Sequence, residues 1–287
     1  MSEQDKQCSQ GSSCQSSKPS GNIEMDMQEK MIEVSLKKIK NKIVVMSGKG
    51  GVGKSSIAAN LAVGLARKGF KVGLMDVDLH GPSIAKIMGM EGMLDITPQR
   101  LIIPWKFGEN LSVVSMQALM REPDQAVIWR GPAKTGVIRS FIADVDWGEL
   151  DYLVLDSPPG TGDEPLTVAQ TMQDASAVIV ATPQEVALAD VRKSISFCKT
   201  VNMNILGIIE NMGSFKCPHC NEPITMFPGG GGELMANNAD VPFLGTIPFD
   251  PDVVKACDNG KPIIQFNENS PFSKAMDKIV TDLTKKA

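Results

Sequence analysis

One glycine-rich segment constrains the fold of this chain more than any other. Residues 46–56 read MSGKGGVGKSS, and positions 48–55 fit the phosphate-binding pattern G-x-x-x-x-G-K-[ST]. The apolar run KIVVM (42–46) ends where the segment begins, and a helical pattern with apolar residues at 57, 61 and 65 follows it. The segment therefore predicts a buried strand and a helix joined by an anion-binding loop.

Each position of this loop has a predicted task. The glycines let the backbone curl so that several N–H groups point inward at phosphate oxygens, and the helix start adds its positive dipole end. Lys54 is placed to neutralise the β- and γ-phosphates, and the Ser55 hydroxyl to ligate Mg²⁺. The residues predicted to bind nucleotide here are Gly48, Lys49, Gly50, Gly51, Val52, Gly53, Lys54, Ser55 and Ser56. Lys49 is a second lysine that the pattern itself does not explain.

The rest of the chain repeats the alternation of strands and helices. Short, continuously apolar runs of this type are typical of parallel strands covered on both faces. We expect strands at 42–46, 71–78, 152–156, 177–182, 205–210 and 242–247, with helical stretches between them. The pattern predicts an α/β fold with a doubly wound, mostly parallel sheet, whose ligands bind at the carboxyl ends of the strands.

Composition sets the domain boundaries and excludes some functions. Residues 1–35 are expected to form a flexible, serine-rich tail (disordered to about residue 22) and a helical lead-in, and residues 36–287 one ATPase domain. The net charge of −4 gives no sign of a nucleic-acid partner. No apolar run approaches the roughly 18 residues of a membrane span, and no secretory signal is recognisable. A cytoplasmic protein is expected.

Three aspartates lie at the ends of predicted strands. Asp156 ends the run YLVLD, where a Walker B aspartate would hold the Mg²⁺ shell. Asp76 and Asp78 end another strand, and their i, i+2 spacing points both to one face if the strand persists. Each of these aspartates, taken alone, could equally be a turn or helix-cap residue. The N-K-x-D stretch typical of guanine readers is absent from the sequence, which favours adenine.

The cysteines differ in their settings. Cys217 and Cys220 form a C-x₂-C pair in a turn-prone loop, a spacing shared by redox dithiols and metal sites. One chain supplies two ligands here, whereas two chains facing each other would supply four, enough for a [4Fe–4S] cluster or equally for zinc. Cys198 falls on an apolar helical face and is expected in the core, and Cys257 is expected at a helix end.

Taken together, these motifs resemble a known class. GKGGVGKS is similar to the deviant Walker A motif of the SIMIBI-class P-loop ATPases, which include MinD, ParA, the nitrogenase iron protein and the Mrp/ApbC/NBP-type iron–sulfur cluster carriers. The last branch is the close match, over about residues 40–287. The segments that carry the resemblance are DVDLHGPS (76–83), WRGP (129–132), LDSPPGTGDE (155–164), ENMG (210–213), CPHC (217–220), FPGGGGE (227–233) and IPFDPDV (247–253).

The resemblance implies further roles. It implies that Lys49 reaches across a homodimer to the partner's nucleotide, that Asp78 orients the attacking water, that Asp76 lies near the Mg²⁺ shell and that Asn211 contacts adenine. It also favours a [4Fe–4S] cluster over zinc between the two C-x₂-C pairs. Cys8 and Cys14, spaced C-x₅-C, are similar to the end of an N-terminal cluster motif of eukaryotic relatives; we expect exposed thiols there, with a labile second cluster as the alternative.

The leading functional hypothesis is an ATP-dependent iron–sulfur cluster carrier. It would be a homodimer that passes its cluster to apo-proteins, with a heteromeric carrier partner left open, and switch segments 76–83 and 156–163 would couple the γ-phosphate to the cluster loop. The alternatives are a ParA/MinD-like spatial-organising ATPase, which has no need of CPHC, and an ATP-driven electron donor resembling the nitrogenase iron protein. The C-terminal segment 271–287 carries one apolar stripe, expected to dock on its own domain rather than on a membrane.

Overall fold

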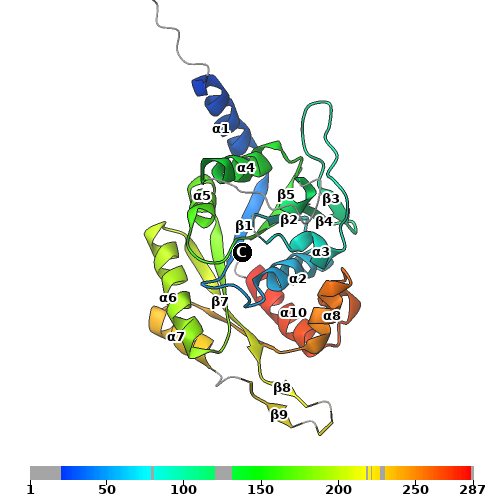
Figure 1. The fold of residues 1–287 in the computed structure, drawn as a ribbon, viewed down its shortest axis with the longest axis vertical. Helices are drawn as coiled ribbons and strands as arrows, with labels where there is room; N and C mark the ends of the chain where they lie inside the picture. The colour runs from blue at the N-terminus through cyan, green and yellow to red at the C-terminus, as the bar shows by residue number, and fades with distance from the viewer. Residues whose placement is uncertain are drawn as a thin grey trace, which may run out of the picture.

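The computed structural model describes residues 21–78, 81–119, 131–217, 219–220, 222–226 and 230–285. Within these ranges the chain builds one large sheet between two layers of helices (Figure 1). Residues 1–20, which hold most of the predicted serine-rich tail together with Cys8 and Cys14, lie outside the described residues. The helical lead-in is described: it is α1 (Gly21–Lys37), which packs on α4 and buries Ile32 in the core.

The sheet has eight strands in the described part of the chain. Neighbouring strands are parallel throughout, apart from the antiparallel pair β3–β4 at one edge. Their order across the sheet is β10 (Phe243–Pro248), β7 (Asn204–Gly213), β6 (Ser176–Ala181), β1 (Ile39–Met46), β5 (Leu150–Asp156), β2 (Val72–Asp76), β4 (Leu111–Ser115) and β3 (Trp105–Phe107). The chain continues to opposite sides of β1, so the strand order reverses there, and ligands bind beside such a reversal. The predicted doubly wound, mostly parallel α/β fold is confirmed.

The strands differ from the sequence prediction in two respects. The expected strand 71–78 ends at Asp76, so the i, i+2 argument for Asp76 and Asp78 on one face of a continuous strand does not hold. Strands β3 and β4 were not expected. β4 is fully buried although it carries two serines, which interrupt the continuous apolar pattern by which the other strands were found.

Helices cover both faces of the sheet. One face carries α2 (Lys54–Arg67), α3 (Ile84–Met88), α8 (Pro251–Asp258), α9 (Ile263–Phe266) and α10 (Pro271–Thr284). The other face carries α1, α4 (Gly131–Asp144), α5 (Asp163–Thr171), α6 (Glu185–Thr200) and α7 (Gly231–Ala239), and the short helix η1 (Met116–Leu119) follows β4. Strand residues alternate between the two cores, because successive side chains point to opposite faces.

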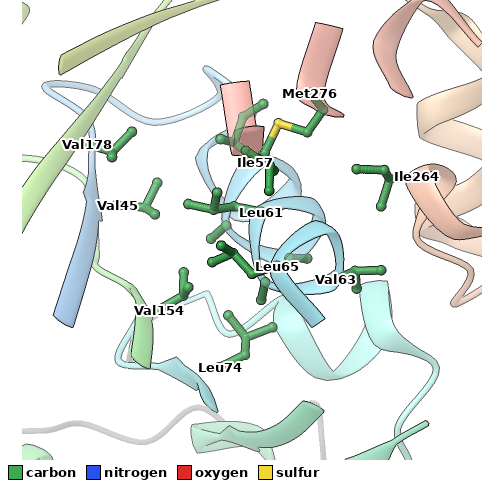
Figure 2. Close-up of a cluster of buried hydrophobic side chains, with 14 of the residues drawn as sticks. Val45, Ile57, Leu61, Val63, Leu65, Leu74, Val154, Val178, Ile264 and Met276 are labelled. Carbon is green, nitrogen blue, oxygen red and sulfur yellow. The ribbon is translucent and has the colours of Figure 1, made fainter. Parts of the chain in front are cut away.

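Helix α2 is the centre of the first core. Figure 2 shows its apolar side chains, including Ile57, Leu61 and Leu65, between the sheet and the C-terminal helices. Position 64 has no room for a side chain, because a Cβ on Gly64 would lie 2.8 Å from Val280 Cγ2 of α10. This burial on both sides fixes the start of α2, and therefore the loop that precedes it.

Three remaining sequence predictions concern helices. The apolar stripe of α10 is buried against its own domain, as predicted, and Met276 is fully inaccessible. Cys198 is a core residue of α6 and Cys257 lies near the end of α8, both as expected. None of the described helices is long and apolar enough to cross a bilayer.

A small hairpin lies apart from the main sheet. β8 (Phe215–Lys216) and β9 (Pro223–Ile224) pair antiparallel and extend away from the body of the protein at the bottom of Figure 1. β8 begins directly after β7, so the hairpin continues the main sheet's own strand.

Candidate functional site

The predicted phosphate-binding loop lies between the end of β1 and the start of α2. Gly51 and Gly53 have φ angles of 78° and 83°, a region that favours glycine. A Cβ on Gly53 would lie 2.4 Å from the Asn211 amide nitrogen, and one on Gly48 would lie 2.3 Å from the backbone oxygen of Asp190. The loop therefore needs glycine both for its backbone conformation and for the close approach of its neighbours.

Lys54 and Asp156 form a buried ion pair beneath this loop. The lysine Nζ lies 2.5 Å from Asp156 Oδ1, and the two side chains are 7% and 0% exposed. Burial raises the pKa of Asp156 above its ordinary value, against the charge and hydrogen bond of Lys54 and the nearby Ser55 hydroxyl, which lower it. The pairing follows from the register, since β5 lies beside β1 and ends at the same edge of the sheet.

One oxygen of Asp156 has no hydrogen-bond partner among the described residues. Oδ2 is buried, and a buried carboxylate oxygen without a donor is costly unless something else satisfies it. Carboxylate and hydroxyl oxygens are the ligands that Mg²⁺ takes beside phosphates. Asp156 Oδ2 and the adjacent Ser55 therefore fit a magnesium ion bound with a nucleotide.

Asp76 has a different environment from Asp156. Its Oδ1 accepts from the Asp78 backbone N–H at 3.0 Å, and its Oδ2 accepts from the Ser115 hydroxyl at 3.0 Å and the Ile84 N–H at 3.3 Å. Burial first, and the charge of Asp156 second, raise the pKa of Asp76 to about 7. With both oxygens occupied, Asp76 holds the segment after β2 in place.

Asp78 begins that segment. Its Oδ1 accepts from the Gly81 N–H at 3.1 Å, and its side chain is almost buried at the edge of the sheet. The register places Asp76 beside Asp156, so the three predicted aspartates gather at one edge with the loop.

Buried polar atoms without hydrogen-bond partners concentrate at this same edge. Among the described residues they are Asp156 Oδ2, Ser157 Oγ, Thr182 Oγ1 and Asp250 Oδ2. Ser157 and Thr182 directly follow β5 and β6, and Asp250 follows β10. Sequence reasoning did not single out Ser157 and Thr182, although a polar residue directly after a buried strand is a signal that could have found them. Asp250 belongs to the IPFD segment (247–250), which the resemblance placed beside the base. Such unsatisfied groups are rare in native proteins and mark where a ligand or water is expected.

Lys49 is held within its own chain. Its Nζ donates to the Gln184 side-chain oxygen at 2.8 Å, in the loop between β6 and α6. Gln184 was not expected from the sequence. The cross-dimer role of Lys49 stays a prediction.

A cavity of about 250 Å³ opens beside the start of α2. Asn211 lies on its wall and donates to the Val52 carbonyl at 2.9 Å, which ties β7 to the phosphate loop. On another wall, Cys257 Sγ lies 3.5 Å from Ser56 Oγ. The remaining lining residues are Gly53, Met212, Pro248, Phe249, Asp250, Val253, Val254, Asp258 and Phe272. A mostly apolar cavity next to a phosphate loop is suited to a nucleotide base.

The two predicted metal-binding cysteines, Cys217 and Cys220, lie on the β8–β9 hairpin and not in the phosphate-binding loop. The Cys217 N–H donates to the Glu222 carbonyl at 2.8 Å, and Cys220 is exposed. Hydrogen bonds from the Cys220 and His219 backbone, and from the Cys220 side chain, lower the pKa of Cys217. No group of three or more His, Cys, Asp or Glu side chains suited to a metal ion occurs in the described part of the chain. One chain thus presents two accessible thiols and needs further ligands from elsewhere.

A glycine-rich loop at the strand-order reversal of a parallel sheet, above a buried lysine–aspartate pair, defines the class of P-loop NTPases. Residues 38–284 match the family described as "ParA: NUBPL iron-transfer P-loop NTPase", and the chain belongs to this family.

Curated relatives and solved structures agree with this assignment. A cytosolic Fe-S cluster assembly factor, Nubp2 homolog 2 of Drosophila yakuba, is 46% identical over 253 residues, covering 86% of this chain and 97% of the relative. An iron-sulfur cluster carrier protein of Methanocaldococcus jannaschii is 45% identical over 256 residues, 88% of each chain.

Among solved structures, a nucleotide-binding protein of Archaeoglobus fulgidus in complex with ADP superposes with a TM-score of 0.72 at 41% identity, covering 82% of this chain and 92% of that one. The cell division ATPase MinD of Pyrococcus furiosus shares the fold, with a TM-score of 0.63 at 24% identity over 86% of this chain and 99% of its own.

Proposed function

We propose that this protein is an ATP-dependent iron–sulfur cluster carrier that works as a homodimer. The observation that carries the proposal is the exposed Cys217–Cys220 hairpin on a chain whose sheet edge is built for a nucleotide. The relatives named as iron–sulfur cluster assembly factors and carriers support this reading, and they make a purely spatial-organising ATPase the weaker candidate.

The cargo is a [4Fe–4S] cluster shared by two chains. A dimer with two-fold symmetry presents the same surface twice, so two hairpins on the axis bring four thiolates together. Four cysteines are the usual ligand set of such a cluster. The lowered pKa of Cys217 favours the thiolate that iron binds. An exposed, shared site also suits a cluster that is handed on to apo-proteins.

The nucleotide site would bind ATP with Mg²⁺. The loop amides and Lys54 would hold the phosphates, Asn211 and the cavity beside it would hold the adenine, and Ser55 and Asp156 would hold the metal. When bound, Mg²⁺ neutralises negative charge on the phosphates. Asp78, kept in place through Asp76, would orient the attacking water, and Lys49 would act on the partner's nucleotide. Slow hydrolysis would then be coupled to loading or transfer of the cluster.

The cellular setting follows from the relatives. Those named cytosolic cluster assembly factors support a cytoplasmic protein whose partners are apo iron–sulfur proteins, with a related carrier chain as a heteromeric alternative to the homodimer.

Anaerobic reconstitution tests the proposal. The full chain is loaded with iron and sulfide, and iron content, sulfide content and native mass are measured together. We expect about one cluster per dimer, since four thiols are needed, and loss of that cluster in the double variant Cys217→Ser, Cys220→Ser. Cys257→Ser, a substitution outside the hairpin, is the matched control and keeps its cluster. Full iron and sulfide in the double variant would contradict the proposal, and Cys8→Ser, Cys14→Ser tests the tail separately.

A further inference from the structure

The base cavity and the cysteine hairpin share a wall. A second cavity, of about 550 Å³, lies at the root of the hairpin, where it is lined by Phe215 and Lys216 of β8. Pro248, Phe249 and Asp250 line both this cavity and the base cavity. One short segment after β10 therefore faces the expected base on one side and the hairpin on the other.

Direct contacts link this wall to the hairpin. The rings of Phe215 and Phe249 pack against each other, with centroids 5.4 Å apart and an interplanar angle of 58°. The Phe249 N–H donates to the Gly213 carbonyl at 3.1 Å, and Pro248 lies opposite Gly213 in the sheet register. A displacement of Phe249 would therefore disturb the packing of Phe215, the first residue of the hairpin.

The path along the backbone from the base cavity to the cysteine hairpin is also short. β7 carries Asn211 and Met212 into the base cavity and then runs through Gly213 to Phe215 and Cys217. Met212 has a φ of 63°, a left-handed conformation that is uncommon for a side chain of this size. Gly213 is packed so closely that a Cβ would lie 2.4 Å from Thr246 Cγ2. Strained and tightly packed backbone between two sites is found where conformation is part of a mechanism.

The γ-phosphate segments offer no comparable path in the described residues, although the phosphate loop itself reaches β7 through the hydrogen bond from Asn211 to the Val52 carbonyl. Gly81 donates to Asp78 within its own segment, whereas Asp156 pairs with Lys54, and Ser157 and Gly160 donate to the Val45 and Ser47 carbonyls. Among the described residues, none of these hydrogen bonds reaches residues 213–217. The sequence-based expectation placed the coupling on these γ-phosphate segments. The contacts favour the base side.

We infer that Phe249 and Phe215 are positioning residues that transmit occupancy of the base cavity to the Cys217–Cys220 hairpin. The inference rests on the proposed function, because it takes the cavity as the adenine site and the hairpin as the cluster site. A bound base fixes Phe249, Phe249 fixes Phe215, and the hairpin root becomes more ordered. ADP carries the base and is therefore sufficient to order the hairpin root. An inorganic polyphosphate, which fills only the phosphate loop, is not sufficient.

Cys257 supplies an internal report of occupancy, because its thiol lines the base cavity. The full chain, without cluster, is treated with ADP or with tripolyphosphate. Alkylation of Cys257 by iodoacetamide, resolved by peptide mass spectrometry, measures filling of the cavity. Amide hydrogen exchange over residues 213–217 measures order at the hairpin root. We expect ADP to slow both, the exchange by about fivefold, at the low end of typical coupling between sites; tripolyphosphate slows neither.

Phe215→Leu separates coupling from binding. In this variant ADP still protects Cys257, and its effect on exchange at residues 213–217 is lost. Phe266→Leu, the same change at an exposed ring on α9, keeps the full wild-type response.

Three results would overturn the inference. One is protection of Cys257 by ADP with unchanged hairpin exchange, another is an undiminished response in Phe215→Leu, and the third is a hairpin response to tripolyphosphate alone. Failure of ADP to bind at all would instead remove the proposed nucleotide site, and the inference with it.

Discussion

At the scale of single residues, the site is a set of acidic groups that the protein treats differently. Asp156 keeps an ion pair with Lys54 and one oxygen without a partner, whereas Asp76, its neighbour across the β2–β5 register, has donors on both oxygens. Two nearby carboxylates in a buried setting disfavour each other's charge. This repulsion adds to burial in raising the pKa of Asp76.

The raised pKa of Asp76 predicts a pH dependence of stability. Burial and the charge of Asp156 raise the pKa of Asp76 from 3.8 to about 7 in the folded chain. Between these values the folded protein binds more protons than the unfolded chain, so the free energy of unfolding falls as the pH rises through this window. Asp76→Asn does not titrate, and its decline should be shallower. Urea unfolding of the nucleotide-free protein at pH 5 and pH 8 measures the slope.

Asp95→Asn is the control for this prediction, since Asp95 is exposed. It should reproduce the wild-type slope. The comparison uses the slope, because Asp76→Asn also alters the hydrogen bond with Ser115 and so shifts the absolute stability for a reason unrelated to titration. Identical slopes in wild type and Asp76→Asn would show that this carboxyl does not carry the effect.

At the scale of elements, the sequence predicted the strands and helices whose apolar pattern is regular. β1, β5, β6 and β7 were found because their apolar runs are unbroken, and α2 because its apolar positions recur at helical spacing. β4 was missed because Ser112 and Ser115 break its pattern, yet Ser115 is one of the groups that hold Asp76. The partners of the site residues, such as Gln184 for Lys49, depend on which loops the fold brings together. Local patterns carry no information about that.

Helix α10 provides a test of how α2, and with it the phosphate loop, is held. Met276 is fully buried in the core that α10 and α2 share. Met276→Ala leaves a cavity there, and we expect it to lower the free energy of unfolding by about 2–5 kcal/mol. Denaturant unfolding measures the loss. Lys278→Ala, on the exposed side of the same helix, should change stability by no more than about 0.5 kcal/mol. A small loss for Met276→Ala would mean that α10 is not firmly docked.

At the scale of the whole molecule, one sheet edge brings together the residues that the proposed function requires. The phosphate loop follows β1, and Asp76 and Asp156 end β2 and β5. Lys49's partner follows β6, and the base cavity and the cysteine hairpin lie at the end of β7. A parallel sheet has this property because all its carboxyl ends lie on one side. The hairpin is the element that extends away from this edge (Figure 1), so the proposed cluster site is connected to the proposed nucleotide site while its cysteines stay accessible.

Mixing two inactive chains tests whether the nucleotide sites are shared between subunits. Lys49→Ala retains a complete phosphate loop and lacks the lysine offered to the partner. Lys54→Gln cannot neutralise its own phosphates, but it still offers Lys49 and keeps a hydrogen-bond donor beside the buried Asp156. Each variant alone should show ATP hydrolysis at background level. With random pairing in a two-fold dimer, half of the dimers are mixed and each has one competent site, so a one-to-one mixture should recover about one quarter of the wild-type rate.

The outcome shows whether Lys49 acts on the nucleotide of its own chain or on that of the partner subunit. If Lys49 acts within its own chain, where it contacts Gln184, the mixture stays as inactive as its components. Nucleotide binding by Lys49→Ala, measured with ADP, shows that its own site is intact and that the loss concerns hydrolysis. Recovery in the mixture requires that a lysine from one chain complete the site of the other. The contact with Gln184 is then the resting arrangement of a side chain whose working partner is the second subunit's nucleotide.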